Sequence, residues 1–368
     1  MDSGHPVALK NVHRRRAWHE TRRAEALERQ RTHRQESIDH ARRLGDVGRL
    51  VEDDVPQGEQ METGFVRPLA SSEQQQDAKQ SMRDYYAGQL MQHEWMTDIP
   101  EDLGHDWLVL PRPEGQRCLV VASKGHTMSY SKKGVTVHRF TSLLPGGCPQ
   151  TGGKTDAITV LDCIFSRESH AYIVMDMMCW AGYRLYDCKS EFRMYWLCSK
   201  LQELPQQGRC GQNSFGFLPV PFHNCDSGGL QAAYAGPVPF RRDGLLLLHR
   251  EGHYDLGTSP LALLWKDGRS SRYFIDTDAK GDISQLKPGI LVQFSIGTDG
   301  IHLHDGELIS ADLTPIGLAN QRRGHADISS KIVFQHMARH QPLTVDMLLA
   351  SLSSTGTGHE EGMVEATA

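Results

Sequence analysis

The stretch from Gln89 to Gly134 contains residue types that together can bind a nucleotide. Trp95 and Trp107 are followed by an apolar run, Cys118–Ala122, and then by lysines in a pattern typical of strand, turn and strand: Lys124, Lys132 and Lys133. An aromatic face can bind a base, and nearby cations can bind its phosphates. The stretch therefore points to a nucleotide as ligand.

Trp265 is a further candidate for the aromatic face. It ends the apolar run in SPLALLWKDG, immediately before Lys266 and a turn. A tryptophan at the end of an apolar strand can also be buried in a core. The residue types alone favour burial over a role as the stacking face.

The surrounding pattern predicts an α+β domain. We expect one helix at Met82–Met96, which places Trp95 at a helix end, and an amphipathic helix at Glu191–Leu201. Turns with Gly or Pro separate short apolar runs at the spacing of antiparallel sheets, and two packed sheets are the simplest fold. The predicted strands are Trp107–Leu110, Arg117–Ser123, Met128–Ser131, Val135–Phe140, Ile158–Phe165, Tyr172–Met178, Phe215–Pro219, Leu245–His249, Leu261–Trp265, Arg272–Ile275 and Gly289–Ser295, and the last two helices are Ile328–His340 and Leu343–Leu352.

A basic arm precedes this body. Between Lys10 and Leu44 there are eleven Lys or Arg residues and five Asp or Glu residues, whereas the whole chain has a net charge of −5. The arm has good helix formers and no Pro or Gly from Arg14 to Leu44, but its apolar residues form no continuous stripe. We therefore expect a helix that stays flexible until a partner orders it. A solvated charged helix or a non-specific RNA-binding arm are the alternatives.

Composition excludes several classes of protein. No apolar run among the 368 residues reaches the length of a membrane span, and we expect neither a transmembrane helix nor a secretory signal peptide. The eight cysteines include no C-x-x-C pair, and several lie in apolar runs, which is typical of buried thiols in a reducing compartment. We expect no metal and no cofactor, and His302 and His304 fit a surface strand better than a metal site.

Eight short sequence motifs, all in the same order, resemble motifs of the snurportin family. They are HARRL (His40–Leu44), QLM and EW (Gln89–Trp95), RFTSLLPGG (Arg139–Gly147), LDCI (Leu161–Ile164), MCW and G (Met178–Gly182), YDC (Tyr186–Cys188), FR and YW (Phe192–Trp196) and DGLL (Asp243–Leu246). With gaps, the similarity covers roughly Asp39 to His340. The resemblance implies two packed antiparallel sheets similar to the mRNA guanylyltransferase or nucleotidyltransferase fold, preceded by a basic helical arm.

The resemblance also implies a function. Snurportins are nuclear import adaptors that bind the trimethylguanosine cap of spliceosomal small nuclear RNA and link the particle to importin β, so this chain is expected to shuttle between cytoplasm and nucleus. The implied cap-binding residues are Trp265, Trp95, His93, Arg117, Gln116, Cys118 and Lys132. Trp265 corresponds to the tryptophan on which the base stacks, although the spacing here is one residue longer than in relatives. Lys132 and Arg117 match residues that hold the phosphates and the neighbouring nucleotide.

The arm resembles an importin-β-binding segment, an arginine-rich helix that lies on the acidic inner surface of a helical-repeat solenoid. The implied contact residues are Arg14, Arg15, Arg16, Arg22, Arg23, Arg29, Arg31, Arg34, Arg42 and Arg43. Relatives use spaced apolar residues at the extreme N-terminus to engage the nuclear export receptor. Only Met1, Val7, Leu9 and Val12 are available for that contact here.

These expectations divide the chain into six parts. Residues 1–13 form a flexible N-terminus, which overlaps the importin-β-binding arm at 10–45, and residues 46–81 form a disordered linker. The cap-binding domain is expected at 82–300. Residues 301–352 form a strand and helices that pack on the body, and 353–368 form a disordered tail.

An enzyme of the covalent nucleotidyltransferase class is the main rival. LLWK (Leu263–Lys266) and DGLLLLH (Asp243–His249) resemble motifs of those enzymes, whose chemistry needs a lysine nucleophile in K-x-D-G. KTDA (Lys154–Ala157) lacks the glycine, and DGEL (Asp305–Leu308) comes too late in the chain. In ASKG (Ala122–Gly125), which aligns better, alanine replaces the nucleophile, so we expect a binding protein and no catalysis.

Overall fold

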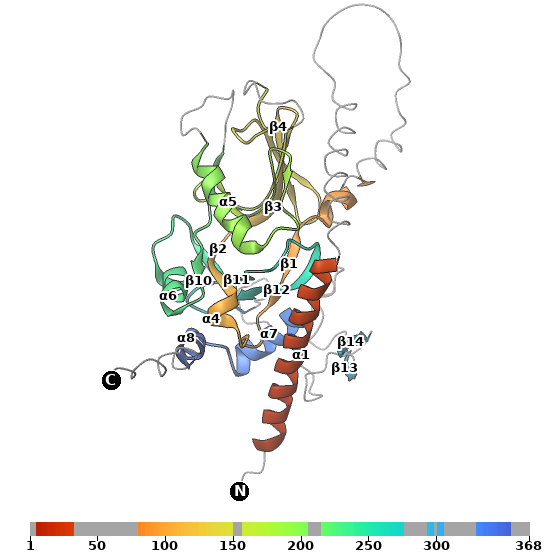
Figure 1. Cartoon of the computed structure of the whole chain (residues 1–368), viewed down its shortest axis with the longest axis vertical. Helices are drawn as coiled ribbons and strands as arrows, with labels where there is room; N and C mark the ends of the chain where they lie inside the picture. Colours follow the sequence, from red (N-terminus) through yellow and green to blue (C-terminus); the bar gives the residue numbers. More distant parts are fainter. Residues whose placement is uncertain are drawn as a thin grey trace, which may run out of the picture.

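The computed structural model describes residues 5–32, 80–81, 83–149, 157–204, 215–275, 293–297, 300–304 and 329–354. Two β-sheets form the body, and a long helix, α1 (His5–Thr32), lies along one side of it (Figure 1). This α+β architecture, with a helix before two mostly antiparallel sheets, confirms the predicted fold class. No helix in these ranges is both long enough and apolar enough to cross a membrane.

The first sheet has the strand order β1-β12-β11-β2-β10. Its edge strand β1 runs parallel to β12, and the other neighbours are antiparallel. The bounds are β1 (Met91–Trp95), β2 (Trp107–Pro113), β10 (His223–Asn224), β11 (Arg242–His249) and β12 (Gly257–Trp265).

The second sheet has the order β5-β4-β3-β6-β7-β8, and β9 pairs with β7 in parallel. Its long central strands are buried along almost their whole length, as expected for strands covered on both faces. The bounds are β3 (Gln116–Ser123), β4 (His126–Ser131), β5 (Thr136–Phe140), β6 (Ile158–Ser166), β7 (Ala171–Trp180), β8 (Tyr183–Arg184) and β9 (Gly216–Pro219). A separate hairpin is formed by β13 (Gln293–Gly297) and β14 (Gly300–His304).

Alternation along β11 separates two apolar clusters. Leu246 and Leu248 belong to the larger cluster, which contains residues of both sheets. Leu245 and Leu247 point to the opposite face, where a smaller cluster packs with the helices α4 (Leu103–Asp106), α6 (Ser227–Ala235) and α8 (Val345–Ser354). Since successive side chains of a strand point to opposite faces, position in the strand decides which cluster a residue enters.

A buried ion pair connects helix α5 (Ser190–Gln202) to the second sheet. Arg193 is 0 % exposed and binds both carboxylate oxygens of Asp176 in β7 at 2.9 Å. The same guanidinium donates to the carbonyls of Cys188 and Gly252, so its donors are satisfied without water. A buried arginine is tolerated only with such pairing.

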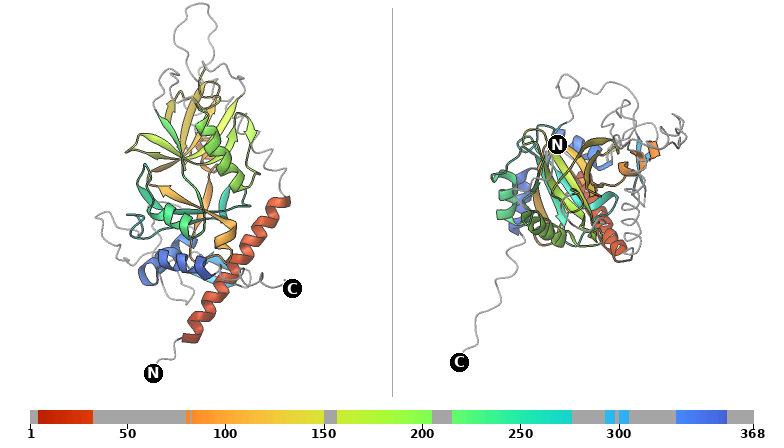
Figure 2. Two further views of the ribbon diagram at one scale, coloured as in Figure 1. Left: turned by 60° about the vertical axis from the view of Figure 1, so that its left-hand side comes forward. Right: turned by 90° about the horizontal axis from the view of Figure 1, so that it is seen from above.

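Helix α1 packs against the edge of the first sheet, which corrects the prediction of a flexible arm (Figure 2). Ala26 is 2 % exposed, and Gln30 donates to Asp255 at 2.7 Å and accepts from the amide of His253. The sequence argument considered only an apolar stripe, whereas α1 is held mainly by polar contacts. Residues 33–45 of the predicted arm lie outside the described residues, as do the linker up to residue 79 and the tail from residue 355.

Other element predictions were wrong in detail. The C-terminal half of the expected helix Met82–Met96 is strand β1, because pairing with β12 and burial of Met91 and Glu94 outweigh helix propensity. Arg272–Ile275 forms turns and bends, not a strand. Helix α6 was not predicted, although Asp226 caps it by accepting from the amide of Gly229 at 2.7 Å.

The described cysteines agree with the prediction for three positions. Cys118, Cys163 and Cys179 are buried free thiols. Cys148, in contrast, is disulfide-bonded.

Candidate functional site

The site is organised around β1, where His93 and Trp95 stand on either side of Glu94. The amide of Trp95 donates to Ser330 Oγ of helix α7 (Ser329–His340) at 3.1 Å, and its ring centroid lies 4.9 Å from that of Phe334. Glu94 is instead bound by Arg22 of α1. An edge strand thus presents its half-buried tryptophan between the sheet and α7.

Arg117 of β3 connects the second sheet to this edge. Its guanidinium binds both oxygens of Asp162 in β6, with the Nε donating to Oδ1 at 2.9 Å, and its Nη2 lies 3.3 Å from His93 Nε2. Arginine can only donate, so His93 Nε2 accepts and the imidazole is neutral. Burial lowers the pKa of His93 well below its usual value, and the charges of Arg117, Arg112 and Lys132 lower it further.

Both carboxylate oxygens of Asp162 accept hydrogen bonds from neighbouring side chains. Besides Arg117, it accepts a hydrogen bond from the hydroxyl of Tyr254 at 2.8 Å. Tyr254 in turn accepts from the amide of Met91 in β1 at 3.1 Å, which closes a network between both sheets. For Arg117, burial opposes the charged form, but the charge and hydrogen bonds of Asp162 together with Tyr254 outweigh it, so the pKa is raised.

A second carboxylate, Asp243 of β11, gathers cations next to Trp95. It binds Arg112 of β2, and it accepts from Lys266 Nζ and Ser271 Oγ at 2.5 Å each. Burial and the charge of Arg112 lower the pKa of Lys266 to about 8. The ammonium of Lys266 lies 5.4 Å from the centre of the Trp95 ring, and that of Lys331 lies 6.0 Å from it.

The arrangement therefore combines an indole with a cluster of cations. Two carboxylates, Asp162 and Asp243, face five cations: Arg112, Arg117, Lys132, Lys266 and Lys331. His93 adds no charge because it is neutral. Such a set of groups suits an anion that also carries an aromatic ring, since the cations can bind phosphates while the indole binds the ring.

Trp265, expected to be the stacking face, is not available in this structure. Its side chain is 0 % exposed in the smaller apolar cluster, and its Nε1 donates to the carbonyl of Leu343 at 3.0 Å. The preceding residue, Leu264, pairs with Trp95. Trp265 lies on the same face of β12 as Leu263, which belongs to the same cluster, because the side chains of a strand alternate between the two faces of a sheet.

The remaining predicted cap residues fall into different places. Cys118 is 0 % exposed inside the larger cluster, and burial raises the pKa of its thiol to about 12, so it cannot touch a ligand in this conformation. Lys132 is exposed in the turn after β4, and Gln116 is half-buried at the start of β3. The structure brings together His93, Arg117 and Lys132, with Trp95 on the same strand as His93.

Sequence reasoning missed Arg112, Asp162, Asp243 and Tyr254. Arg112 continues the alternation of Leu108 and Leu110 toward the space between the sheets, and that signal was present in the sequence. Asp162 stands alone within an apolar strand, which also indicates a buried partner. No sequence signal points to Tyr254, which lies in the loop before β12.

The predicted arm residues are partly engaged by the body. Arg22 binds Glu94, Arg23 binds Asp98 at 3.0 Å, and Arg16 lies 3.4 Å from Glu101. Arg31 pairs within the helix with Glu28. Arg14, Arg15 and Arg29 belong to α1 as well, whereas Arg34, Arg42 and Arg43 lie outside the described residues.

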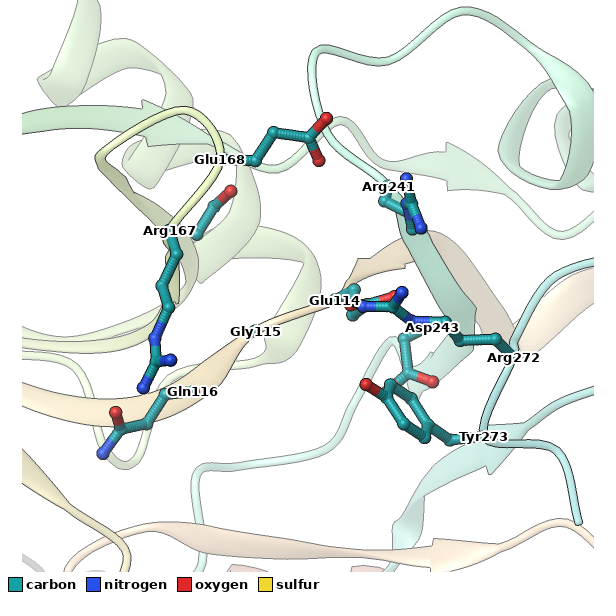
Figure 3. Close-up of a pocket in the computed structure, with 10 residues that line it drawn as sticks. Glu114, Gly115, Gln116, Arg167, Glu168, Arg241, Asp243, Arg272 and Tyr273 are labelled. Carbon is teal, nitrogen blue, oxygen red and sulfur yellow. Dashed lines mark hydrogen bonds and ion pairs between the residues drawn. The ribbon is translucent and has the colours of Figure 1, made fainter. Parts of the chain in front are cut away.

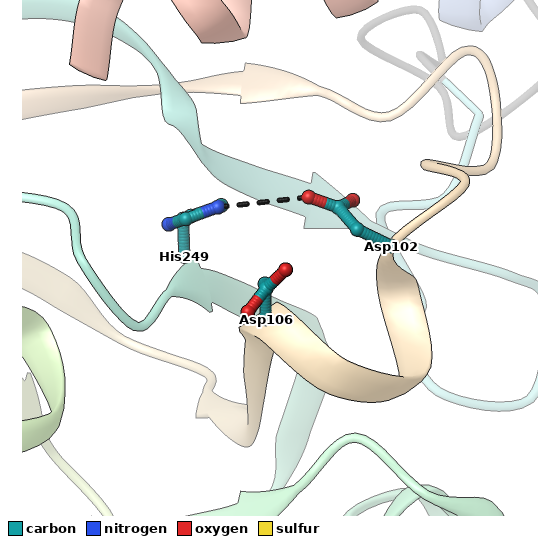
Figure 4. A group of neighbouring side chains, drawn as sticks. All are labelled: Asp102, Asp106 and His249. Atoms are coloured by element: carbon teal, nitrogen blue, oxygen red, sulfur yellow. Dashed lines mark ion pairs between the residues drawn. The ribbon is translucent and has the colours of Figure 1, made fainter. Parts of the chain in front are cut away.

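One group of possible metal ligands stands close together in the described part of the chain: Asp102, Asp106 and His249 (Figure 4). The donor set fits a metal poorly. His249 Nδ1 accepts from the amide of Glu251 at 3.2 Å, so Nε2, which lies 3.6 Å from Asp102, carries the proton in the neutral ring. A metal needs that nitrogen unprotonated. Asp102 also accepts from Trp107 Nε1 at 2.9 Å, and the group is explained as a structural network.

Comparison with known families gives a match to one domain. Residues 89–266, which contain His93, Trp95, Arg112, Arg117, Lys132, Asp243 and Lys266, match the family model described as Snurportin1, m3G cap-binding domain.

Several solved DNA ligase structures are similar in part. The ligase domain of LigD from M. tuberculosis has 16 % sequence identity and a TM-score of 0.34, with 49 % of this chain and 59 % of that chain covered. The Chlorella virus DNA ligase-adenylate has 13 % identity and a TM-score of 0.33, with 49 % and 69 % covered. The mycobacterial DNA ligase D complexed with ATP and MES has 16 % identity, a TM-score of 0.34 and coverage of 48 % and 59 %. The chain thus spans less than two thirds of the length of the mycobacterial ligase structures, and likeness at this level says nothing of its activity.

Proposed function

Since the chain belongs to the snurportin family through residues 89–266, we propose that it binds the trimethylguanosine cap of small nuclear RNA as a nuclear import adaptor. The observation that carries this proposal is that the matched region contains the indole of Trp95 beside the cation cluster described above. In this proposal the protein links capped particles to importin β, shuttles between cytoplasm and nucleus, and is returned by an export receptor.

We assign base stacking to Trp95 in place of Trp265. The methylated guanine carries a delocalised positive charge and is attracted to the negative face of an indole. Trp95 is half-buried, and it belongs to the same strand as His93. The ammonium groups of Lys266 and Lys331, which lie over this indole at 5.4 and 6.0 Å from its centre, are near enough to bind the phosphates that follow the base.

The cations support a triphosphate as part of the ligand. Arg112 and Arg117, which are the two guanidinium groups of the cluster, are already oriented by Asp243 and Asp162. Because these side chains are already ordered, binding loses less conformational entropy. The neutral imidazole of His93 keeps its Nδ1–H, which is a donor for an oxygen of the ligand.

The same network supports tolerance for the trimethylated base. The two additional methyl groups remove the hydrogen-bond donors of the exocyclic nitrogen, so a carboxylate built to accept those donors would discriminate against the cap. Asp162 already accepts from Arg117 and Tyr254, and Asp243 accepts from Arg112, Lys266 and Ser271. Neither carboxylate needs the donors that an unmethylated base offers.

Importin β is the partner that we propose for the arm. The arginines of α1 provide charge and bidentate hydrogen bonds for an acidic surface. Because Glu94 and Asp98 already bind Arg22 and Arg23, an importin complex that uses these two residues must first replace both ion pairs. A general RNA-binding arm remains the competing assignment, and it predicts steep salt dependence without cap preference.

We further propose that the protein binds without catalysing a reaction. At the position that aligns best with the lysine nucleophile of covalent nucleotidyltransferases, Ala122 is 0 % exposed in β3 and offers only a methyl group. Lys266 has a lowered pKa and deserves a direct test for this reason. The full chain should form no acid-labile adduct with labelled GTP and a divalent metal, and an adduct would overturn the binding-only assignment.

Fluorescence quenching with the full chain tests cap binding. Titration with trimethylated cap dinucleotide should quench tryptophan emission and saturate, and unmethylated GpppG should compete only weakly. In the Trp95→Ala variant the affinity should fall by about 1–3 kcal/mol, the value for a lost base–aromatic stack. Equal affinity for methylated and unmethylated dinucleotide would contradict the proposal.

A further inference from the structure

A cavity of about 570 Å³ opens beside the site described above. It lies between the turn joining β2 to β3, the turn joining β6 to β7, the start of β11 and the segment after β12 (Figure 3). Its lining consists of Glu114, Gly115, Gln116, Ser166, Arg167, Glu168, Arg241, Asp243, Arg272 and Tyr273. The volume is within the range of small-molecule sites in proteins.

The three arginines that line the cavity differ in their ion pairs. Arg272 pairs with Glu114 across the cavity wall. Neither Arg167 nor Arg241 makes an ion pair with any residue that the structure describes. In Figure 3 these two side chains stand on opposite sides of the opening, and the Arg167 side chain runs toward Gln116.

The cavity also offers an aromatic face and an unused acceptor. Tyr273 is 54 % exposed, and the Arg272 guanidinium lies 5.2 Å from the centre of its ring. Glu114 Oε2 is buried without a hydrogen-bond partner. A ligand that fits these groups has a flat ring, an anionic group and hydrogen-bond donors. A nucleotide has all three, because ribose hydroxyls and base amino groups donate.

The cavity and the proposed cap site share one residue. Asp243 lines the cavity and binds Lys266, which lies over Trp95. The backbone at Gly115 runs close to the carbonyl of Phe165, and a Cβ at this position would clash with that carbonyl.

We propose that this cavity binds a nucleotide of the RNA chain beyond the cap, with its phosphate between Arg167 and Arg241 and its base on Tyr273. The assignment rests on the proposed cap-binding function and extends it from the cap to the body of the RNA. It gives the protein a second contact that a free cap does not make.

The test compares two ligands on the full chain: trimethylated GTP, which ends at the cap, and a hexanucleotide RNA with a trimethylated cap. The variant Arg167→Gln/Arg241→Gln should leave binding of trimethylated GTP within twofold of wild type. For the capped hexanucleotide, affinity at 0.15 M salt should fall about tenfold and the slope of log K against log salt should decrease by about 0.7, as expected for one lost phosphate contact on a single strand.

The control variant Arg139→Gln/Lys189→Gln removes the same charge from exposed positions on β5 and before α5. It should bind both ligands like wild type. Tyr273→Leu should weaken the hexanucleotide about fivefold or more, whereas Tyr273→Phe, which keeps the ring, should not. Melting temperatures of all variants verify that they are folded.

Three results would overturn the assignment. They are an unchanged hexanucleotide affinity in the arginine variant, an equal loss for both ligands, and an equal loss in the control variant. The cap proposal fails separately, if wild type does not bind trimethylated GTP. In that case an uncapped hexanucleotide still tests the cavity, because its affinity must depend on Arg167 and Arg241 by the same factor.

Discussion

Arg22 of α1 and Glu94 of β1 form a two-pronged ion pair, with nitrogen–oxygen distances of 3.0 and 2.5 Å. The carboxylate side chain is 5 % exposed and that of the arginine 31 %. Glu94 stands between His93 and Trp95 in the sequence, so strand β1 contains both the residue that binds the basic helix and the proposed cap contacts. Release of α1 would free Glu94, and cap binding would occupy the two residues beside it.

The first prediction concerns the ion pair between Arg22 and Glu94. Arg22→Gln should loosen α1, because it leaves the buried charge of Glu94 without its partner. Trypsin should then cleave within α1 several times faster than in wild type. Arg31→Gln is the matched control, since Arg31 pairs with Glu28 of the same helix at the surface. Equal cleavage rates for the two variants would show that Arg22 does not hold the helix.

The second prediction separates two tryptophans. Trp265→Ala should lower the free energy of unfolding by about 3–5 kcal/mol, as for other buried aromatic side chains, because Trp265 is sealed in the smaller cluster. Trp265→Phe should keep the fold and bind cap with nearly wild-type affinity. Urea unfolding and cap titration measure the two effects. If Trp265→Phe loses cap binding while Trp95→Ala keeps it, the roles assigned to these residues must be exchanged.

The third prediction follows from the lowered pKa of His93. The unfolded chain takes up a proton at this residue near pH 6.5, whereas the folded chain does so only at much lower pH. The unfolded state therefore binds more protons below pH 6.5, and stability falls as the pH decreases through that region, by up to about 1.4 kcal/mol per pH unit from this group. His93→Gln should remove this part of the slope. Urea unfolding at pH 7.0, 6.0 and 5.0 gives the comparison, and parallel curves for wild type and variant would count against a neutral, buried His93.

The fourth prediction concerns metals. Because the proton on His249 Nε2 faces Asp102, chelation with EDTA should change neither the melting temperature nor cap affinity. Added Zn²⁺ at a small excess should likewise have no effect through this group. His249→Ala provides the check: a zinc-induced rise in melting temperature that disappears in this variant would establish a metal site at Asp102, Asp106 and His249.

Much of the sheet architecture could be predicted from the sequence. Ile158–Ser166 and Ala171–Trp180 are apolar runs of the length of buried strands, and their pairing in one sheet follows from the short turn between them. Strand β1 was not readable, because a five-residue edge strand that pairs in parallel with residues more than 160 positions later has no local signature.

By itself, the sequence determined the residue types of the proposed nucleotide site, which are a tryptophan, arginines and lysines within one stretch, and the short motifs that indicate the family. Only the tertiary structure decided which tryptophan lies beside the cations. The direction of a side chain depends on strand register, and a shift of one residue moves it to the other face of the sheet. The tertiary structure also decided that the basic helix is docked, because Arg22 meets Glu94 and Arg23 meets Asp98 only after the chain has folded. Ion pairs between residues more than 70 positions apart leave no periodic pattern, and so no argument from local sequence can reveal them.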